Sequence, residues 1–223
     1  MTKPGSLVDS SDFIITRKRK KYRFALFHNA ANCFELDDWK PHTAKYLVVE
    51  IGAGTGLFLV ELAQRHPDRT YIALDVKADR LQKGARRALE LGLTNISFVR
   101  ARADQLLEVV KSGSVRDIWL TFSDPFPKKG SAKRRLTYRT FLELYKKAHV
   151  QKNARLLMKT DSHGLFDWSL EQLVGHGWCP TELTYDLHES NLDTEYKIMT
   201  SYEQKWTEQG LPIMFVVAKQ TTD

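Results

Sequence analysis

The sequence predicts an α/β fold built on a mostly parallel sheet, and two observations support this prediction. From Thr43 onward, short apolar runs of strand length alternate with segments of helical periodicity. A glycine-rich turn separates the first apolar run from the first helical segment. The chain has 223 residues, of which 42% are hydrophobic, so it can bury the core of one such domain.

The apolar runs predict seven strands. The first five have the length and residue types of buried parallel strands. The last two flank a helix that ends at Gly210-Leu211-Pro212, and we expect one antiparallel strand in this region. In chain order the runs are Tyr46–Ile51, Tyr71–Asp75, Ile96–Arg100, Asp117–Phe122, Arg155–Thr160, Thr181–Leu187 and Ile213–Ala218.

Apolar stripes at helical spacing lie between these runs. Leu81, Ala85 and Ala88 form one stripe, and the pair Leu91-Gly92 that follows is typical of a helix C-terminus. A second stripe runs from Tyr138 to Ala148. Before the domain, residues 1–42 are expected to form a basic N-terminal extension, disordered at its start, which leaves residues 43–223 for the domain itself.

Composition excludes several classes of protein. No apolar run approaches the ~18 residues that a membrane crossing needs, and the N-terminus lacks a secretory signal. Cys33 and Cys179 are too few for a disulfide framework, and neither they nor the seven histidines have metal-ligand spacing, so we expect no metal. These features favour a cytoplasmic protein. The net charge of +7 suggests a polyanionic partner.

The turn after the first run carries three glycines at alternate positions, Gly52, Gly54 and Gly56. Such a turn lets a ligand approach the backbone closely. The dinucleotide fingerprint G-x-G-x-x-G would need glycine at position 57, which is leucine. Glu50, two residues before the turn, suits a cationic ligand, and Asp75 at the end of the second run suits ribose hydroxyls. Taken alone, each acid would be a solvated carboxylate at a strand end.

A third segment, after the run that ends at Arg100, is expected at the same edge of the sheet. Folds of this kind that bind an adenine-containing cofactor contact the adenine at this position, so the backbone groups of Arg102 and Ala103, or the side chain of Asp104, are candidates for that contact. An equally good interpretation makes Asp104 the N-cap of a helix that begins before Leu106.

The fourth run leads into a loop stiffened by two prolines, Phe122-Ser123-Asp124-Pro125-Phe126-Pro127-Lys128-Lys129. Ligands bind at the carboxyl ends of strands in open α/β sheets, so we expect this loop to face the same crevice as the glycine turn. Asp124 can accept hydrogen bonds from a base edge, and Phe126 offers a stacking face. Lys128 and Lys129 suit phosphates.

Two basic clusters are the candidates for phosphate contacts with a polyanionic partner. Isolated clusters are more often solvated charge, but one of these lies inside the candidate site loop. The candidates are Lys129, Lys133, Arg134 and Arg135 in that loop, and Arg17, Lys18, Arg19, Lys20 and Lys21 near the N-terminus.

The loop, followed by Lys133-Arg134-Arg135-Leu136-Thr137, resembles the signature of bacterial single-subunit tRNA (guanine-N7)-methyltransferases. Two later segments match as well, Lys159-Thr160-Asp161 and Thr200-Ser201-Tyr202-Glu203. The family usually has tryptophan where this chain has Phe126, and a glutamate where it has Ser201. The resemblance covers about residues 46–217.

This resemblance implies a Rossmann-like fold with helices on both faces of a seven-stranded sheet, and S-adenosylmethionine (SAM) as cofactor. It implies methylation of guanosine N7 in the variable loop of tRNA, at nucleotide 46, by a monomer or homodimer without an obligate protein partner. The alternatives are methylation of another RNA base and a non-catalytic RNA-binding relative. The implied cofactor residues are Glu50, Gly52, Gly54, Gly56, Asp75, Arg102, Ala103 and Asp124, of which Asp124 is also catalytic. The implied guanosine contacts are Lys128, Asp161, Thr200, Ser201, Tyr202 and Glu203.

Overall fold

The structure, a computed structural model, describes residues 7–13, 18–150 and 153–221. The chain divides into two compact units, unit 1 (Met1–Val110) and unit 2 (Lys111–Asp223). Arg17, one of the predicted phosphate contacts, lies outside the described residues.

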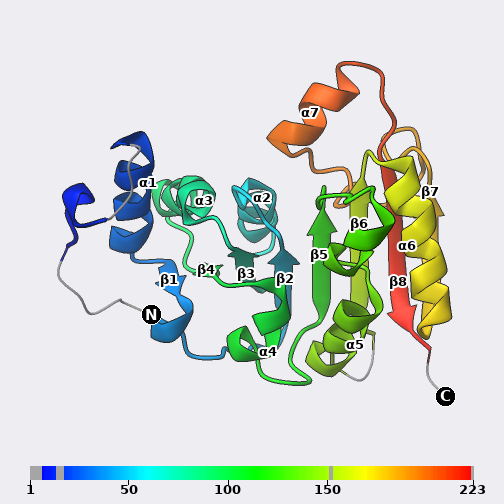
Figure 1. Cartoon of the computed structure of the whole chain (residues 1–223), viewed down its shortest axis with the longest axis horizontal. Helices are drawn as coiled ribbons and strands as arrows, with labels where there is room; N and C mark the ends of the chain where they lie inside the picture. The colour runs from blue at the N-terminus through cyan, green and yellow to red at the C-terminus, as the bar shows by residue number, and fades with distance from the viewer. Residues whose placement is uncertain (1–6, 14–17, 151–152, 222–223) are drawn as a thin grey trace. The chain divides into compact units, whose positions relative to one another are not determined.

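The sheet of unit 1 has four parallel strands (Figure 1). Its central strands are buried along almost their whole length, as strands with helices packed against them must be. In sheet order the strands are β1 (Cys33–Glu35), β4 (Ile96–Arg100), β3 (Thr70–Asp75) and β2 (Leu47–Ile51).

Helix α3 (Ala78–Glu90) shows why the helices of unit 1 form where they do. Its predicted apolar stripe is buried, and the chain leaves the helix through Gly92 at φ 66°. Helix α1 packs beside α3, so part of the expected N-terminal extension is folded onto unit 1 (Figure 1). The other helices are α1 (Lys18–Asn29), α2 (Leu57–Arg65), α4 (Leu106–Val109) and the short 3-10 helices η1 (Ser10–Asp12), η2 (Leu36–Asp38) and η3 (Ala103–Gln105).

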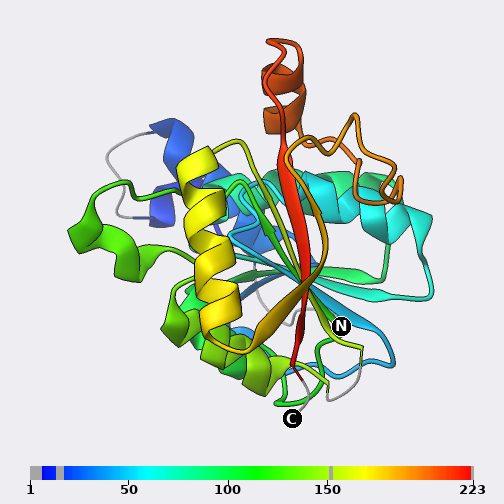
Figure 2. The same cartoon turned by 90° about the vertical axis from the view of Figure 1, so that its right-hand side faces the viewer.

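The sheet of unit 2 also has four strands. β5 and β6 are parallel, while β8 runs antiparallel to both of its neighbours, β6 and β7. Helix α6 packs along β7, and α7 lies beyond the ends of the strands (Figure 2). The strands are β5 (Asp117–Thr121), β6 (Arg155–Thr160), β8 (Met214–Gln220) and β7 (Trp178–Thr184), and the helices are η4 (Lys129–Arg134), α5 (Arg139–Ala148), α6 (His163–Gly175) and α7 (Ser201–Thr207).

The α/β class, the mostly parallel strands and the antiparallel strand near the C-terminus are confirmed. The strand number is wrong by one, because the described residues contain eight strands. The additional strand, β1, is three residues long and lies in the segment expected to be an extension. Several boundaries also differ. The ends of β2, β3, β5 and β8 shift by one or two residues, and Phe122 leaves strand geometry at φ 49°. The largest shift is in β7, which begins at Trp178 and ends at Thr184, three residues before the predicted run at each end.

Candidate functional site

The glycine turn of unit 1 has the conformation that its sequence predicts. Gly52, Gly54 and Gly56 all have positive φ, at 75°, 56° and 67°. Other residues pay a steric penalty in this region, which explains why glycine occupies each alternate position. The amides of Gly52 and Ala53 donate to the carbonyl of Leu74, at 2.8 and 3.0 Å, and tie the turn to β3.

Asp75 holds the same turn from the end of β3. Its Oδ2 accepts the amide hydrogen of Gly54 at 2.8 Å, and its Oδ1 accepts that of Lys77 at 2.8 Å. Glu50 lies in β2, beside Ala73 of β3, and is 1% exposed. The structure thus brings the glycine turn and the Asp75 carboxylate into direct contact, with Glu50 at the end of the adjoining strand.

Gly84 of α3 is a further requirement of this turn that the sequence analysis missed. Its amide donates to the carbonyl of Thr55 at 3.0 Å, and a Cβ on Gly84 would lie 2.3 Å from that oxygen. The local signal was available, since a glycine inside a helical stripe often marks a close approach between backbones.

A cavity of about 290 Å³ lies where β1, β3 and β4 end in unit 1. Asp104 does not cap a helix: it lies within η3, and its carboxylate pairs with the guanidinium of Arg102. The N-cap interpretation of Asp104 is therefore wrong, while the adenine contacts of Arg102, Ala103 and Asp104 stay predictions. The cavity is lined by Glu35, Leu36, Asp37, Val76, Arg100, Ala101, Arg102 and Gln105.

In unit 2, residues from three separate segments of the chain meet. The hydroxyl of Tyr202 in α7 donates to Oδ2 of Asp161, just after β6, at 3.3 Å. Burial raises the pKa of Tyr202, and the negative charges of Asp161 and Asp124 raise it further. The ring of Phe122 lies 5.2 Å from that of Tyr202. Asp161 and Tyr202 are therefore neighbours, and Asp124, whose charge acts on the same hydroxyl, follows the parallel strand β5 at the same end of the unit 2 sheet.

A buried cluster fixes the start of α7. Lys159 of β6 and Glu203 of α7 are both 0% exposed, and the ammonium donates to both carboxylate oxygens at 3.2 Å. His188 Nε2 lies 2.9 Å from Glu203 Oε1. Glu203 Oε2 accepts the amide hydrogen of Thr200, whose hydroxyl in return accepts that of Glu203.

Glu203 therefore directs its charge into the protein, and its contact with guanosine stays a prediction. The guanosine contacts of Thr200, the N-cap of α7, and of Ser201, whose side chain is not described, also stay predictions.

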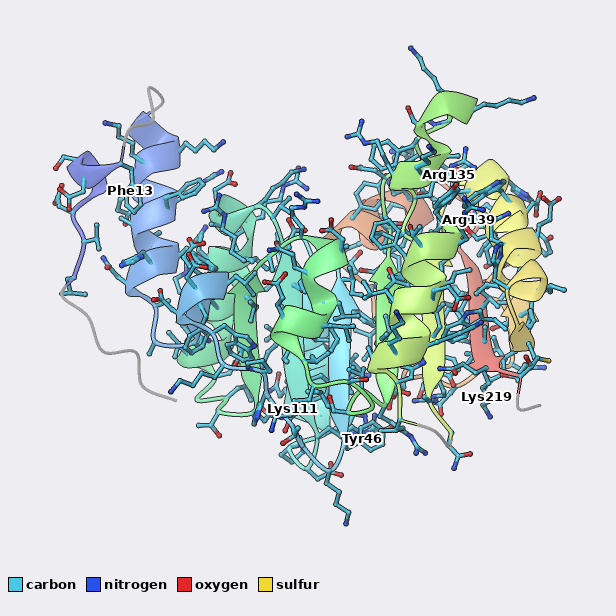
Figure 3. The ribbon with its side chains drawn as sticks, turned by 60° about the horizontal axis from the view of Figure 1, so that its bottom comes forward. Phe13, Tyr46, Lys111, Arg135, Arg139 and Lys219 are labelled. Carbon is cyan, nitrogen blue, oxygen red and sulfur yellow. The ribbon has the colours of Figure 1, made fainter. Side chains whose placement is uncertain are left out.

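The basic loop of unit 2 presents most of its charge to solvent. Lys128, Lys129, Lys133 and Arg134 are exposed, and Arg134 lies over the ring of Phe126 at 4.3 Å. Arg135, in contrast, is 9% exposed. Figure 3 labels it beside the yellow helix α6.

The N-terminal cluster falls in and before α1 of unit 1. Lys20 is exposed and lies 5.8 Å from the ring of Phe24, and Lys21 is half-buried. The backbones of Lys18 and Arg19 begin the helix, but their side chains are not described. Among the described residues there is no group of three or more His, Cys, Asp or Glu that could hold a metal ion. No described helix has both the length and the apolar character of a membrane span.

Comparisons with known proteins identify the family. Residues 44–216 match the family model described as "Putative methyltransferase". The tRNA (guanine-N(7)-)-methyltransferase of Brevibacillus brevis is 39% identical over 170 residues, which are 76% of this chain and 78% of the relative. This chain belongs to the tRNA (guanine-N(7)-)-methyltransferase family. The family explains why the matches to its signature occur in order along the chain.

Solved structures support the fold. The 16S rRNA methyltransferase KamB has a TM-score of 0.60 at 15% identity, covering 81% of this chain and 90% of that one. A 16S rRNA (adenine(1408)-N(1))-methyltransferase variant from Catenulisporales acidiphilia, with cosubstrate SAM, has a TM-score of 0.56 at 12% identity. The match covers 99% of this chain and 95% of that one. The Rossmann-like methyltransferase fold is thereby confirmed.

Proposed function

We propose that this protein transfers a methyl group from SAM to N7 of a guanosine in tRNA, at the variable-loop position that the family resemblance implies. The grouping of Asp124, Asp161 and Tyr202 beside an exposed basic loop supports this function best. The proposal includes a cytoplasmic enzyme that acts as a monomer or homodimer without an obligate protein partner.

The residues of unit 1 fit SAM. Bound SAM supplies an electrophilic methyl group on a sulfonium. Glu50 is a buried carboxylate and suits the positive charges of the cofactor. A Cβ on Gly54 would meet nothing within 4 Å, so the turn leaves open space beside its backbone. Asp75 would accept the ribose hydroxyls with the lone pairs that the Gly54 and Lys77 amides leave open.

Guanine N7 has an in-plane lone pair and no proton, so its attack on the methyl group needs no general base. The reaction needs in-line positioning and stabilisation of the positive charge that moves onto the purine. In this proposal Asp124 and Asp161 accept hydrogen bonds from the N1–H and N2–H₂ edge, which selects guanine and favours the cationic product. Lys128, Thr200 and Tyr202 complete the contacts with the guanosine.

Basic side chains of both units would bind the tRNA backbone. Lys129, Lys133 and Arg134 lie on the loop that follows Asp124, and Lys20 and Lys21 lie on α1. Each phosphate contact would add to the salt dependence of binding. Because Glu50 belongs to unit 1 and Asp124 to unit 2, the shared crevice expected from the sequence stays a prediction, as does the domain boundary at residue 42.

The decisive experiment incubates the protein with labelled SAM and unmodified tRNA and maps N7-methylguanosine by strand cleavage. We expect cleavage at one variable-loop guanosine. Asp124→Asn should lower the single-turnover rate about a hundredfold, because a charge-stabilising acceptor is lost, while SAM affinity changes much less.

Glu171→Gln, on the exposed surface of α6, is the matched control and should keep the wild-type rate. Label on another base would contradict the substrate. Equal losses of rate and SAM affinity in Asp124→Asn would leave Asp124 a cofactor residue only.

A further inference from the structure

Three consecutive cations in unit 2, Lys133, Arg134 and Arg135, look equivalent in the sequence, but the structure separates them. Lys133 and Arg134 are exposed, whereas Arg135 is 9% exposed. A cation that binds RNA phosphate must present its charge to solvent. Arg135 therefore differs from its two neighbours in the property on which the sequence prediction depends.

The guanidinium of Arg135 makes three contacts within unit 2. Its Nε donates to the carbonyl oxygen of Pro125 at 3.0 Å, and one terminal nitrogen donates to that of Phe126 at 3.1 Å. The central carbon of its guanidinium lies over the ring of Trp168 in α6, 4.4 Å from the centroid. Two donors in a fixed fork plus a stacking face are features of arginine that lysine lacks.

The segment that Arg135 contacts, Pro125 to Pro127, has few backbone hydrogen-bond donors of its own. Pro125 and Pro127 have no amide hydrogen to donate. Phe126 between them has a φ of 39°, a left-handed conformation that costs a non-glycine residue on the order of 1 kcal/mol or more. Such a conformation persists only where surrounding contacts enforce it. The two hydrogen bonds from Arg135 supply that enforcement at both carbonyls.

Asp124 immediately precedes this braced segment. A displacement of Pro125 therefore moves the backbone that carries the Asp124 carboxylate, and misplacement by about 1 Å can cost a hundredfold in rate. We infer that Arg135 is a positioning residue, which fixes the segment from Asp124 to Pro127 against Trp168 of α6, in place of the phosphate contact that the sequence predicts. This inference rests on the proposed function only for the catalytic role of Asp124.

Two substitutions of Arg135, compared with Lys133→Gln, separate positioning from phosphate binding. Arg135→Lys keeps the charge but loses the fork, so the single-turnover rate at saturating tRNA should fall on the order of tenfold to a hundredfold. Arg135→Gln removes the charge, yet the slope of log K for tRNA binding against log salt should stay at its wild-type value. Lys133→Gln should flatten that slope by about 0.7–0.9, because one phosphate contact is lost.

Lys219→Gln, an exposed lysine on β8, is the control for both measurements and should change neither. A wild-type rate in Arg135→Lys, or a slope in Arg135→Gln that flattens as in Lys133→Gln, would overturn the inference.

A third measurement does not depend on methylation. Amide hydrogen exchange over residues 122–132 should speed up at least tenfold in Arg135→Lys, and also in Trp168→Leu, which removes the stacking face and leaves Arg135 in place. Unchanged exchange in both variants would overturn the inference that Arg135 positions this segment. If wild-type protein fails to methylate tRNA but hydrogen exchange in the variants responds as expected, the proposed function is wrong while the positioning role of Arg135 is supported.

Discussion

The glycine turn of unit 1 and the proline loop of unit 2 hold their functional groups by different means. In the turn, backbone amides do the holding: Gly52 and Ala53 donate to Leu74, and Gly54 donates to Asp75. In the loop and its surroundings, long side chains do it, through the Arg135 fork and the buried ion pair beneath α7. Backbone geometry depends on which residues are glycine, whereas side-chain bracing depends on partners distant in sequence.

This difference determines how each region should fail. A substitution of a glycine in the turn changes steric fit and leaves the pairing of charged groups unchanged. A change in the bracing of unit 2 leaves a buried charge or a polar group without its partner, which costs more.

The largest effect is expected where a buried charge in unit 2 loses its partner. Glu203→Leu leaves the ammonium of Lys159 at 0% exposure, with the carbonyl of Ile198 still accepting from it. Removing one partner of a buried ion pair costs about 3–5 kcal/mol. Urea unfolding should show a loss of free energy of unfolding of that size, and the N-terminus of α7 should lose protection from hydrogen exchange.

The control is the double variant Lys159→Met with Glu203→Leu, which removes both charges. It should recover most of the lost stability, because the desolvation penalty disappears with the ion pair. A double variant no more stable than Glu203→Leu would mean that shape, and not charge, decides stability at this position.

The second effect concerns pH and a buried histidine of unit 2. Burial lowers the pKa of His149 from 6.5 to about 4, with the charge of Asp117 opposing this shift. Between those pH values the unfolded chain binds a proton that the folded chain does not, so stability falls as pH drops from 6.5 toward 4. The full effect is about 3 kcal/mol, and urea unfolding at stepwise lower pH measures it.

His149→Gln should abolish this part of the pH dependence, because glutamine does not titrate in the range. If the variant keeps the wild-type slope between pH 6.5 and 4, another group is responsible.

The third effect tests backbone fit in unit 1. Gly84→Ala places a Cβ 2.3 Å from the carbonyl oxygen of Thr55, so α3 and the glycine turn must separate. Overpacking of this kind costs about 1–3 kcal/mol, and titration calorimetry should show weaker SAM binding as the turn shifts. Gly175→Ala in α6 is the control: it meets nothing within 4 Å and should leave SAM binding unchanged.

The smallest effect is expected at the Tyr202 hydroxyl, which is bonded at 3.3 Å to Asp161 in a partly exposed position. Tyr202→Phe removes one hydrogen bond, worth about 0.5–1.5 kcal/mol. The KM for tRNA should rise severalfold with kcat almost unchanged. Because burial and the nearby carboxylates raise the pKa of Tyr202, the wild-type hydroxyl should keep its proton throughout the neutral pH range. A collapse of kcat would place the hydroxyl in the chemical step.

The comparison also explains what the sequence could predict. The glycine turn is contiguous, and the three positive φ angles explain why each glycine is needed, so the motif indicates its own conformation. Strands β4 and β6 fall where their apolar runs predict them. Strand β1 was missed because three residues are too few to show a period.

The bracing in unit 2 could not be predicted in the same way. Nothing in the order Lys133-Arg134-Arg135 tells which cation turns inward, because that depends on the position of Trp168, 33 residues away from Arg135. The Thr200-x-x-Glu203 spacing did carry a local signal, that of a capping box. The partners of Glu203, Lys159 and His188, are distant from it in sequence, so no local sequence signal indicated those contacts.

The carboxylate of Asp75 has a consequence for substitution at its position. Its two oxygens each accept one amide hydrogen, from Gly54 and from Lys77. Asparagine, nearly identical in shape, has one acceptor and one NH₂ group, so one of those backbone amides would face another donor. The isosteric replacement is therefore more disruptive than its size suggests, because a hydrogen bond is replaced by a repulsive contact between two donors.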